Sequence, residues 1–179
     1  KIVTVPVFKN SERAFKDKMT VVLTSQNPKD KIYYSINGKK EQTFKNPISI
    51  KETTTIKAYV KNGEKKSKTI SGTFTKKPND YAITLHSTYT PQYHAGGSDG
   101  LLDGIFGTEN WKKGDWQGYF DQDFEAVIDL GKAKSISEVD AHFLQDSRSW
   151  IMMPTKMEIY TSTNKEVFKL AGVIEKDAN

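Results

Sequence analysis

The sequence contains no cysteine. This absence excludes disulfides, thiolate nucleophiles and zinc sites built from cysteine. Hydrophobic residues make up only 36% of the 179 residues, which is little for one deep core but ordinary for thin β-sandwiches with solvated faces. No apolar run is long enough to cross a membrane, and no signal segment opens the chain at Lys1. We therefore expect a globular piece of a longer protein, with no transmembrane segment.

Charge is divided unevenly between two halves of the chain. Residues 1–78 contain 18 Lys and Arg against 6 Asp and Glu, whereas residues 79–179 contain 9 against 16. This asymmetry predicts two domains, joined by the polar segment 75–80. Seventeen of the 18 cations are lysines scattered along alternating segments, as on solvated strand faces. Nucleic-acid sites favour clustered arginines beside exposed aromatics, so we expect no nucleic-acid partner.

The first half reads as short strands separated by turns. β-branched and alternating residues predict strands over 19–25, 31–38, 46–50, 53–63 and 67–77. Tight turns are predicted at Asn37-Gly38 and Asn62-Gly63, because these residue pairs adopt positive φ readily. No segment of this half shows apolar residues at the spacing of a helix. The pattern predicts a small β-sandwich over residues 1–77.

The second half has fewer strands and one long irregular run. The predicted strands cover 81–87, 124–131, 135–146, 155–164 and 166–175, the third of them with a bulge. Between the first two lies a run of about thirty-five residues that is rich in glycine and aromatic residues. A loop of this length is uncommon in a compact domain unless it is functional.

The motifs of residues 80–179 resemble the discoidin family, which includes coagulation-factor C-type domains and bacterial carbohydrate-binding modules. They are "LLDGIFGTENW", "WQGYF", "FEAVIDLGKAKSISEVDAHFLQD", "SWIMMP" and "MEIYTS". The upstream "KIYYSINGKK…PISIKETTTIKAYVKNG" resembles the small sandwich that closes bacterial chitobiases and β-N-acetylhexosaminidases. Together the resemblances imply an all-β chain. An immunoglobulin- or fibronectin-like sandwich (1–77) would precede a galactose-binding-like jelly roll (78–179) without its last strands.

These resemblances imply a non-catalytic C-terminal part of a bacterial family 20 glycoside hydrolase. Its implied partners are a glycan, of galactose or N-acetylhexosamine type, and the catalytic domain of the same protein. Its implied location is exported, either periplasmic or at the cell surface or secreted. The alternative function is a structural or protein- and surface-interaction module with no sugar site.

In the discoidin family, ligands dock at loops on one end of the sandwich. The corresponding loops here are 87–98, 109–122 and 145–153. A pyranose-binding site needs an aromatic ring that stacks on the apolar face of the sugar. It also needs polar side chains that can form paired hydrogen bonds to the hydroxyl groups. The candidate sugar-binding residues are His94, Trp116, Asp146, Arg148 and Trp150. Of these, we expect His94, Arg148 and Asp146 to hydrogen-bond to sugar hydroxyls. We expect Trp116 or Trp150 to stack on the apolar face of the sugar.

Each aromatic or charged candidate also has a structural interpretation. Trp111 and Phe120 are typical of core at the end of a sandwich. Trp150 could plug the core instead of facing a sugar. Arg148 could pair only with Asp146 on the surface, where such a pair contributes little stability.

A structural calcium ion is the one cofactor that the family resemblance implies. Asp103 and Thr108 fit the family's calcium loop, and Ca²⁺ prefers hard oxygen ligands of these kinds. The alternative is that Asp103 caps a turn and Thr108 packs beside it. The acidic residue that the family's last strand often contributes has no counterpart here.

We expect no catalytic residues in this chain. The segment "GGSDG" (96–100) matches a nucleophile-elbow pattern, but it lacks the preceding buried strand and the following helix. The paired carboxylates of hexosaminidases sit on a barrel that short strands cannot build.

Overall fold

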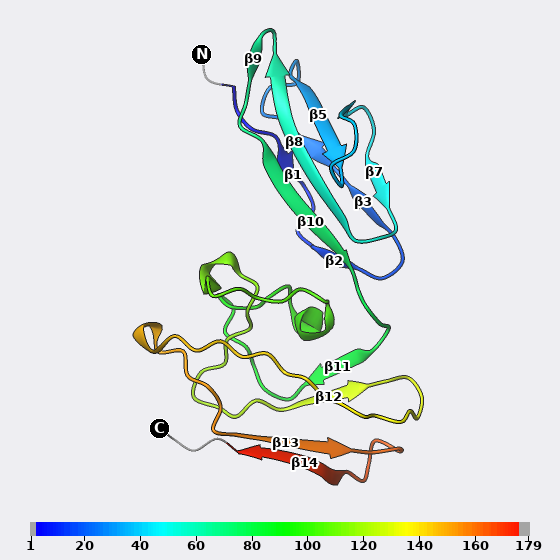
Figure 1. Cartoon of the computed structure of the whole chain (residues 1–179), viewed down its shortest axis with the longest axis vertical. Helices are drawn as coiled ribbons and strands as arrows, with labels where there is room; N and C mark the ends of the chain where they lie inside the picture. Colours follow the sequence, from blue (N-terminus) through cyan, green and yellow to red (C-terminus); the bar gives the residue numbers. More distant parts are fainter. Residues whose placement is uncertain (1–2, 176–179) are drawn as a thin grey trace. The chain divides into compact units, whose positions relative to one another are not determined.

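The computed structural model describes residues 3–175 and is almost entirely β (Figure 1). The described residues form short strands and three single-turn 3₁₀ helices, so the predicted all-β sandwich class is confirmed. Backbone contacts divide the chain into two compact units, Lys1–Asp129 and Leu130–Asn179. This division differs from the predicted one, and the domains 1–77 and 78–179 stay a prediction.

The main sheet of the first unit has the strand order β2-β10-β8-β5-β6, and β9 pairs with β8. The strands are β2 (Ala14–Phe15), β5 (Lys31–Ile36), β6 (Gln42–Thr43), β8 (Thr54–Asn62), β9 (Lys65–Lys66) and β10 (Ile70–Lys76). All neighbours are antiparallel except β2 and β10, which run parallel.

Two small sheets supply the other strands of this sandwich. They pair β1 (Val7–Phe8) with β4 (Leu23–Thr24), and β3 (Met19–Val21) with β7 (Ile48–Ile50). All five strands predicted in this half are present. The two-residue strands β1, β2, β6 and β9 were not predicted, because two residues are too few to display an alternation.

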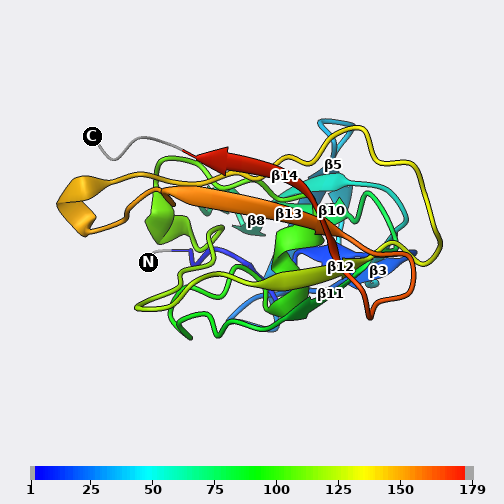
Figure 2. The same cartoon turned by 90° about the horizontal axis from the view of Figure 1, so that it is seen from below.

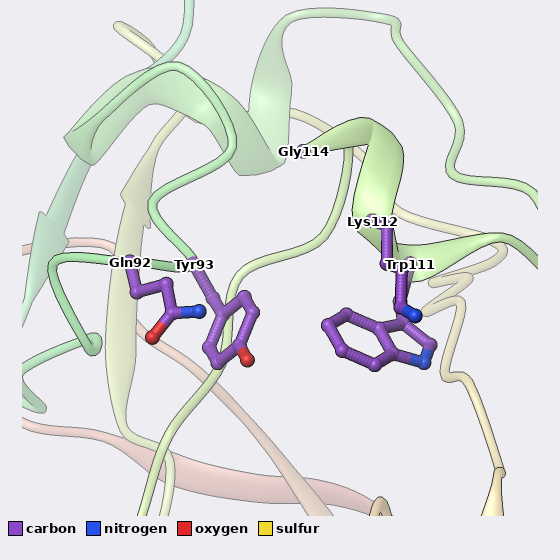
Figure 3. Close-up of a pocket in the computed structure, with 5 residues that line it drawn as sticks. All are labelled: Gln92, Tyr93, Trp111, Lys112 and Gly114. Atoms are coloured by element: carbon purple, nitrogen blue, oxygen red, sulfur yellow. The ribbon is translucent and has the colours of Figure 1, made fainter. Parts of the chain in front are cut away.

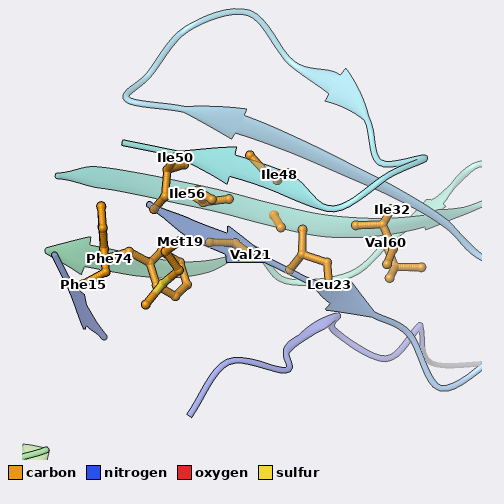
Figure 4. Close-up of a cluster of buried hydrophobic side chains, with 11 residues drawn as sticks. Phe15, Met19, Val21, Leu23, Ile32, Ile48, Ile50, Ile56, Val60 and Phe74 are labelled. Atoms are coloured by element: carbon orange, nitrogen blue, oxygen red, sulfur yellow. The ribbon is translucent and has the colours of Figure 1, made fainter. Parts of the chain in front are cut away.

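The sandwich core is built from the inward positions of these strands (Figure 4). Ile56, Val21 and Val60 are fully buried. Alternate burial along β3 and β7 matches the period of two that a strand imposes. The Asn37-Gly38 turn is confirmed by φ angles of 48° and 72°, the pair of positive values that a type I′ hairpin turn requires.

The remainder of the first unit is a hairpin interrupted by the long irregular run. β11 (Ala82–Leu85) pairs antiparallel with β12 (Ala126–Asp129). Between them lie two single-turn helices, η1 (Ser98–Leu102) and η2 (Trp111–Lys113). Both strands and the irregular run between them agree with the prediction.

The second unit contains η3 (Ser147–Ser149) and the hairpin of β13 (Lys156–Thr161) with β14 (Lys169–Glu175). Figures 1 and 2 both show these two strands side by side, and their register shifts between Ile159 and Tyr160.

The strand predicted over 135–146 is wrong, because no strand is assigned between residues 130 and 155. Apolar alternation becomes a strand only where a neighbour completes its hydrogen-bond ladder, and within residues 3–175 β13 and β14 pair only with each other. The apolar residues Ile136, Val139 and Phe143 of this segment are exposed.

Candidate functional site

Two irregular segments between β11 and β12, residues 87–98 and 109–122, are hydrogen-bonded to each other. The Thr90 N–H donates to the Gly118 carbonyl at 2.7 Å, and the Gly118 N–H donates to the Tyr93 carbonyl at 3.0 Å. A β-carbon at Gly118 would lie 3.0 Å from Cβ of Tyr93, so glycine permits this close approach. The two predicted binding loops of the first unit therefore form one surface.

The Gln117 side chain reinforces this connection. Its Nε2 donates to the carbonyls of His94 (3.1 Å) and Gly97 (2.6 Å), and its Oε1 accepts from the Tyr119 hydroxyl at 2.6 Å. Burial raises the pKa of that Tyr119 hydroxyl, so it stays protonated and can donate. The side-chain amide thus joins both loops from the inside.

A pocket of about 340 Å³ opens on this surface (Figure 3). Its lining residues are Gln92, Tyr93, Trp111, Lys112 and Gly114. The rings of Tyr93 and Trp111 meet edge to face, with centroids 5.7 Å apart and planes at 79°. Nζ of Lys112 lies 5.3 Å from the Trp111 ring centroid. Two aromatic rings, one amide and one ammonium therefore share a small hollow.

Local sequence explains why Trp111 stands at this pocket. Asn110 precedes η2, and its Oδ1 accepts from the Lys112 N–H at 3.2 Å, as an N-terminal cap does. Gly114 ends the turn at φ 79°, a left-handed conformation that glycine adopts without strain, and its N–H donates to the Trp111 carbonyl. The two caps fix the backbone of the turn that carries the indole.

This combination of groups suits a ligand with a flat apolar face and a polar rim. The aromatic rings offer apolar surface, the Gln92 amide both donates and accepts, and the Lys112 ammonium donates. None of the five lining residues carries a carboxyl group. Glycoside hydrolysis by paired carboxyls is therefore not a reaction that these side chains can perform.

Two predicted sugar-binding residues, His94 and Trp116, lie in the loops that carry this pocket. His94 is exposed next to Tyr93, and its Nδ1 accepts from the Gly96 N–H at 3.2 Å. The Trp116 indole N–H donates to the Thr108 carbonyl at 2.7 Å. These contacts hold loop backbone. Sugar binding by His94 and Trp116 stays a prediction.

The other three predicted residues, Asp146, Arg148 and Trp150, belong to the second unit. Asp146 and Ile151 exchange two backbone hydrogen bonds of 3.0 Å, and Ser149 Oγ donates to Asp146 Oδ2 at 2.7 Å. The η3 turn that this closes carries Arg148 and Trp150. Convergence of these residues with His94 of the first unit stays a prediction.

Trp150 is exposed at 85% and adopts φ 59°. Within its own unit, Trp150 therefore does not plug a core. Phe120, interpreted as core, is exposed at 83% and is followed by Asp121 at φ 54°. Trp111 is half-buried at the pocket.

The two predicted calcium ligands, Asp103 and Thr108, are engaged in contacts within a turn. Asp103 is buried, and its Oδ1 accepts from the Ile105 N–H at 2.7 Å, which closes an Asx turn. Thr108 is exposed, and its carbonyl is bonded to Trp116. Within residues 3–175, no group of three or more metal-ligating acidic or imidazole side chains is assembled. Calcium binding by Asp103 and Thr108 stays a prediction.

Tyr93 and Trp111 lie in the predicted binding loops, but neither is among the predicted sugar-binding residues. Gln92, Lys112 and Gly114 were not singled out. The available signal was the segment "NWKKG" (110–114), in which a capping asparagine and a terminating glycine bracket one helical turn. That turn presents an aromatic residue at its start.

Among residues 3–175, no helix is long and apolar enough to span a bilayer.

Comparison with known proteins addresses the first half of the chain. No curated protein matches the chain. Residues 11–73, which are 63 of the 179 residues, match the family model of the chitobiase/beta-hexosaminidase C-terminal domain. The resemblance of the first half to the sandwich of these enzymes is therefore confirmed, whereas the discoidin resemblance of residues 80–179 stays a prediction.

Proposed function

We propose that this chain is a non-catalytic accessory region of a β-N-acetylhexosaminidase-type glycoside hydrolase and that it binds glycan at the pocket of Tyr93 and Trp111. The family match of residues 11–73 supports the hydrolase parent. The pocket supports glycan binding and is the observation on which this function depends. The parent enzyme would be exported and bacterial, as the family resemblance implies.

A hexose fits the chemistry of this pocket. Its apolar face would lie against the Trp111 ring, with the Tyr93 ring closing one side. The Gln92 amide can bridge neighbouring hydroxyls or pair with the acetamide of an N-acetylhexosamine. The Lys112 ammonium, which lies over the Trp111 ring with its Nζ 5.3 Å from the ring centroid, adds a hydrogen-bond donor. Galactosides and N-acetylhexosaminides are therefore the ligands to test.

The benefit to the parent enzyme would be proximity. A weak sugar contact on a linked module raises the effective substrate concentration at the attached active site without any new catalytic group. Loss of this contact should lower activity on polymeric substrate and leave activity on a small soluble substrate unchanged.

Calorimetric titration against galactosides and N-acetylhexosaminides, with and without calcium, tests this function. Trp111→Ala should abolish binding, while Trp150→Ala should leave it unchanged. Far-UV circular dichroism and thermal unfolding of each variant show that it has folded. Loss of binding only in Trp150→Ala would move the site to the η3 turn. No binding by the unmodified chain in any condition would refute the glycan function.

A second candidate function is contact with a surface through the η3 turn. Trp150 is exposed at 85%, and Met152 two residues later is also exposed. This arrangement is suited to inserting apolar side chains into an interface. Co-sedimentation with phosphatidylserine-containing vesicles tests it: binding that Trp150→Ala removes and Trp111→Ala retains would support this candidate. If the unmodified chain stays in the supernatant while the vesicles sediment, this candidate is refuted.

A further inference from the structure

Two cations of the first sandwich form ion pairs with the irregular run. Nζ of Lys77 lies 2.7 Å from Oδ2 of Asp99, and Nη2 of Arg13 lies 2.5 Å from Oδ1 of Asp115. The Lys77 and Asp115 side chains are only 16% and 11% exposed. Both pairs connect residues of the first unit that lie 22 and 102 positions apart in the chain.

The backbones that carry these cations are fixed at one edge of the main sheet. The Arg13 carbonyl accepts from the Thr75 N–H at 2.7 Å, and the Lys77 N–H donates to the Phe15 carbonyl at 2.8 Å. These bonds flank the parallel pairing of β2 with β10. Arg13 and Lys77 therefore project from backbone that is hydrogen-bonded in place, so only their side chains have to be ordered when the ion pairs form.

The irregular run approaches this edge closely between the two ion pairs. A β-carbon at Gly104 would lie 3.1 Å from Cδ of Pro78, so the backbone of the run contacts the segment that leaves β10. Asp103 beside it is 6% exposed. Burial raises the pKa of its carboxyl group, and the positive charges of Arg13 and Lys77 act in the opposite direction. Packing and electrostatics thus join the run to the sandwich at three positions.

We propose that Arg13 and Lys77 are positioning residues for the aromatic pocket. Asp115 directly follows Gly114 of the pocket wall and lies four residues after Trp111, so the Arg13 ion pair holds the end of η2. The sandwich of chitobiase/beta-hexosaminidase C-terminal type would then help to hold the pocket loop in place. The structural part of this inference is independent of the ligand. Only its effect on affinity rests on the proposed glycan function.

The burial of Asp115 decides between this role and an ordinary surface pair. Exposed ion pairs contribute little, and the Arg13 side chain is 46% exposed. Removing Arg13, however, leaves a nearly buried carboxylate without its charged partner, and such a group costs far more to keep in place. We therefore expect loss of Arg13 to speed amide hydrogen exchange in the loop by about threefold to tenfold.

Hydrogen exchange of the amides of residues 98–118 tests the inference on the full chain. Arg13→Glu should speed their exchange about tenfold, because it sets two like charges against each other. The charge-swapped double variant Arg13→Glu/Asp115→Arg should restore slow exchange. Arg13→Gln offers a milder change if the reversal impairs folding. Lys16→Glu is the matched control, because Lys16 pairs with Asp80 at 3.8 Å and both side chains are exposed.

Unchanged loop exchange in both Arg13 variants would overturn the inference, as would equal acceleration by Lys16→Glu. If the unmodified chain binds glycan, Arg13→Glu should weaken binding about threefold to tenfold and the double variant should restore it. Faster loop exchange in a chain that binds no glycan would uphold the positioning role and refute the proposed function, so the two failures can be told apart.

Discussion

Gly107 is the position where one added methyl group should reveal how the loop is held. A β-carbon there would lie 2.2 Å from Cε2 and 2.4 Å from Nε1 of Trp116, well inside contact distance. Gly107→Ala therefore has to push the indole away. The displaced ring would lose the 2.7 Å hydrogen bond from its Nε1 to the Thr108 carbonyl.

The expected cost combines two effects. Overpacking a close contact costs about 1–3 kcal/mol. Losing the indole hydrogen bond costs about 1 kcal/mol. We expect Gly107→Ala to lower the stability of the loop by about 2–4 kcal/mol. Because Gly107 does not lie among the glycines with positive φ, this loss comes from the clash and not from backbone strain.

Removing the ring should reverse the sign of the effect. In a Trp116→Ala background the space is free, and alanine restricts the unfolded chain more than glycine does. The same Gly107→Ala change should then be neutral or stabilising by up to about 1 kcal/mol. The difference between the two backgrounds is the coupling between Gly107 and Trp116.

Tryptophan fluorescence during urea unfolding measures this cycle. The chain has three tryptophans, so Trp111 and Trp150 are replaced by phenylalanine to leave Trp116 as the reporter. The Trp116→Ala variants have no such reporter, and hydrogen exchange of residues 105–117 measures their stability instead. Gly107→Ala should shift the Trp116 emission to longer wavelength. An equal cost of Gly107→Ala with and without the indole would refute the packing described here.

Three further predictions concern charge, core and surface. Burial raises the pKa of Asp103, so the stability contributed by this carboxyl falls as the pH rises from about 3.8 through its folded pKa. Asp103→Asn should therefore raise the melting temperature at pH 7, and thermal scans should show the gain closing as the pH approaches 4. A gain that does not depend on pH would contradict this cause. Ile56→Ala should lower the free energy of unfolding by about 2–5 kcal/mol in urea titrations, because Ile56 is fully buried in the sandwich core. Phe120→Ser should change the same free energy by less than about 0.5 kcal/mol, since its ring is exposed, and a larger loss would show that the ring packs after all.

The sandwich strands could be predicted because each signal was local. Asn37-Gly38 specifies its own turn, and the alternation of Ile56, Ala58 and Val60 along β8 specifies which face is buried. Such patterns need no knowledge of the neighbouring strand. Edge strands as short as β2 have no pattern to display, and their existence follows only from the strand that they join.

The candidate site could be predicted only in part. The loops and their aromatics were visible in the sequence, but whether Trp111 faces inward or lines a pocket depends on the ring of Tyr93, eighteen residues earlier. The ion pair of Arg13 with Asp115 left no signal at all, because its partners lie 102 residues apart and each looks like an ordinary surface charge. Long-range partners of this kind require the folded chain.

The parallel pairing of β2 with β10 sets the order in which this protein can fold during synthesis. Residues 14 and 15 have no partner until residues 75 and 76 have left the ribosome, so the sandwich stays open over most of its translation. A chain cut after residue 73, where the family match ends, would lack this closure. Recombinant fragments of the sandwich should therefore extend at least to Lys77.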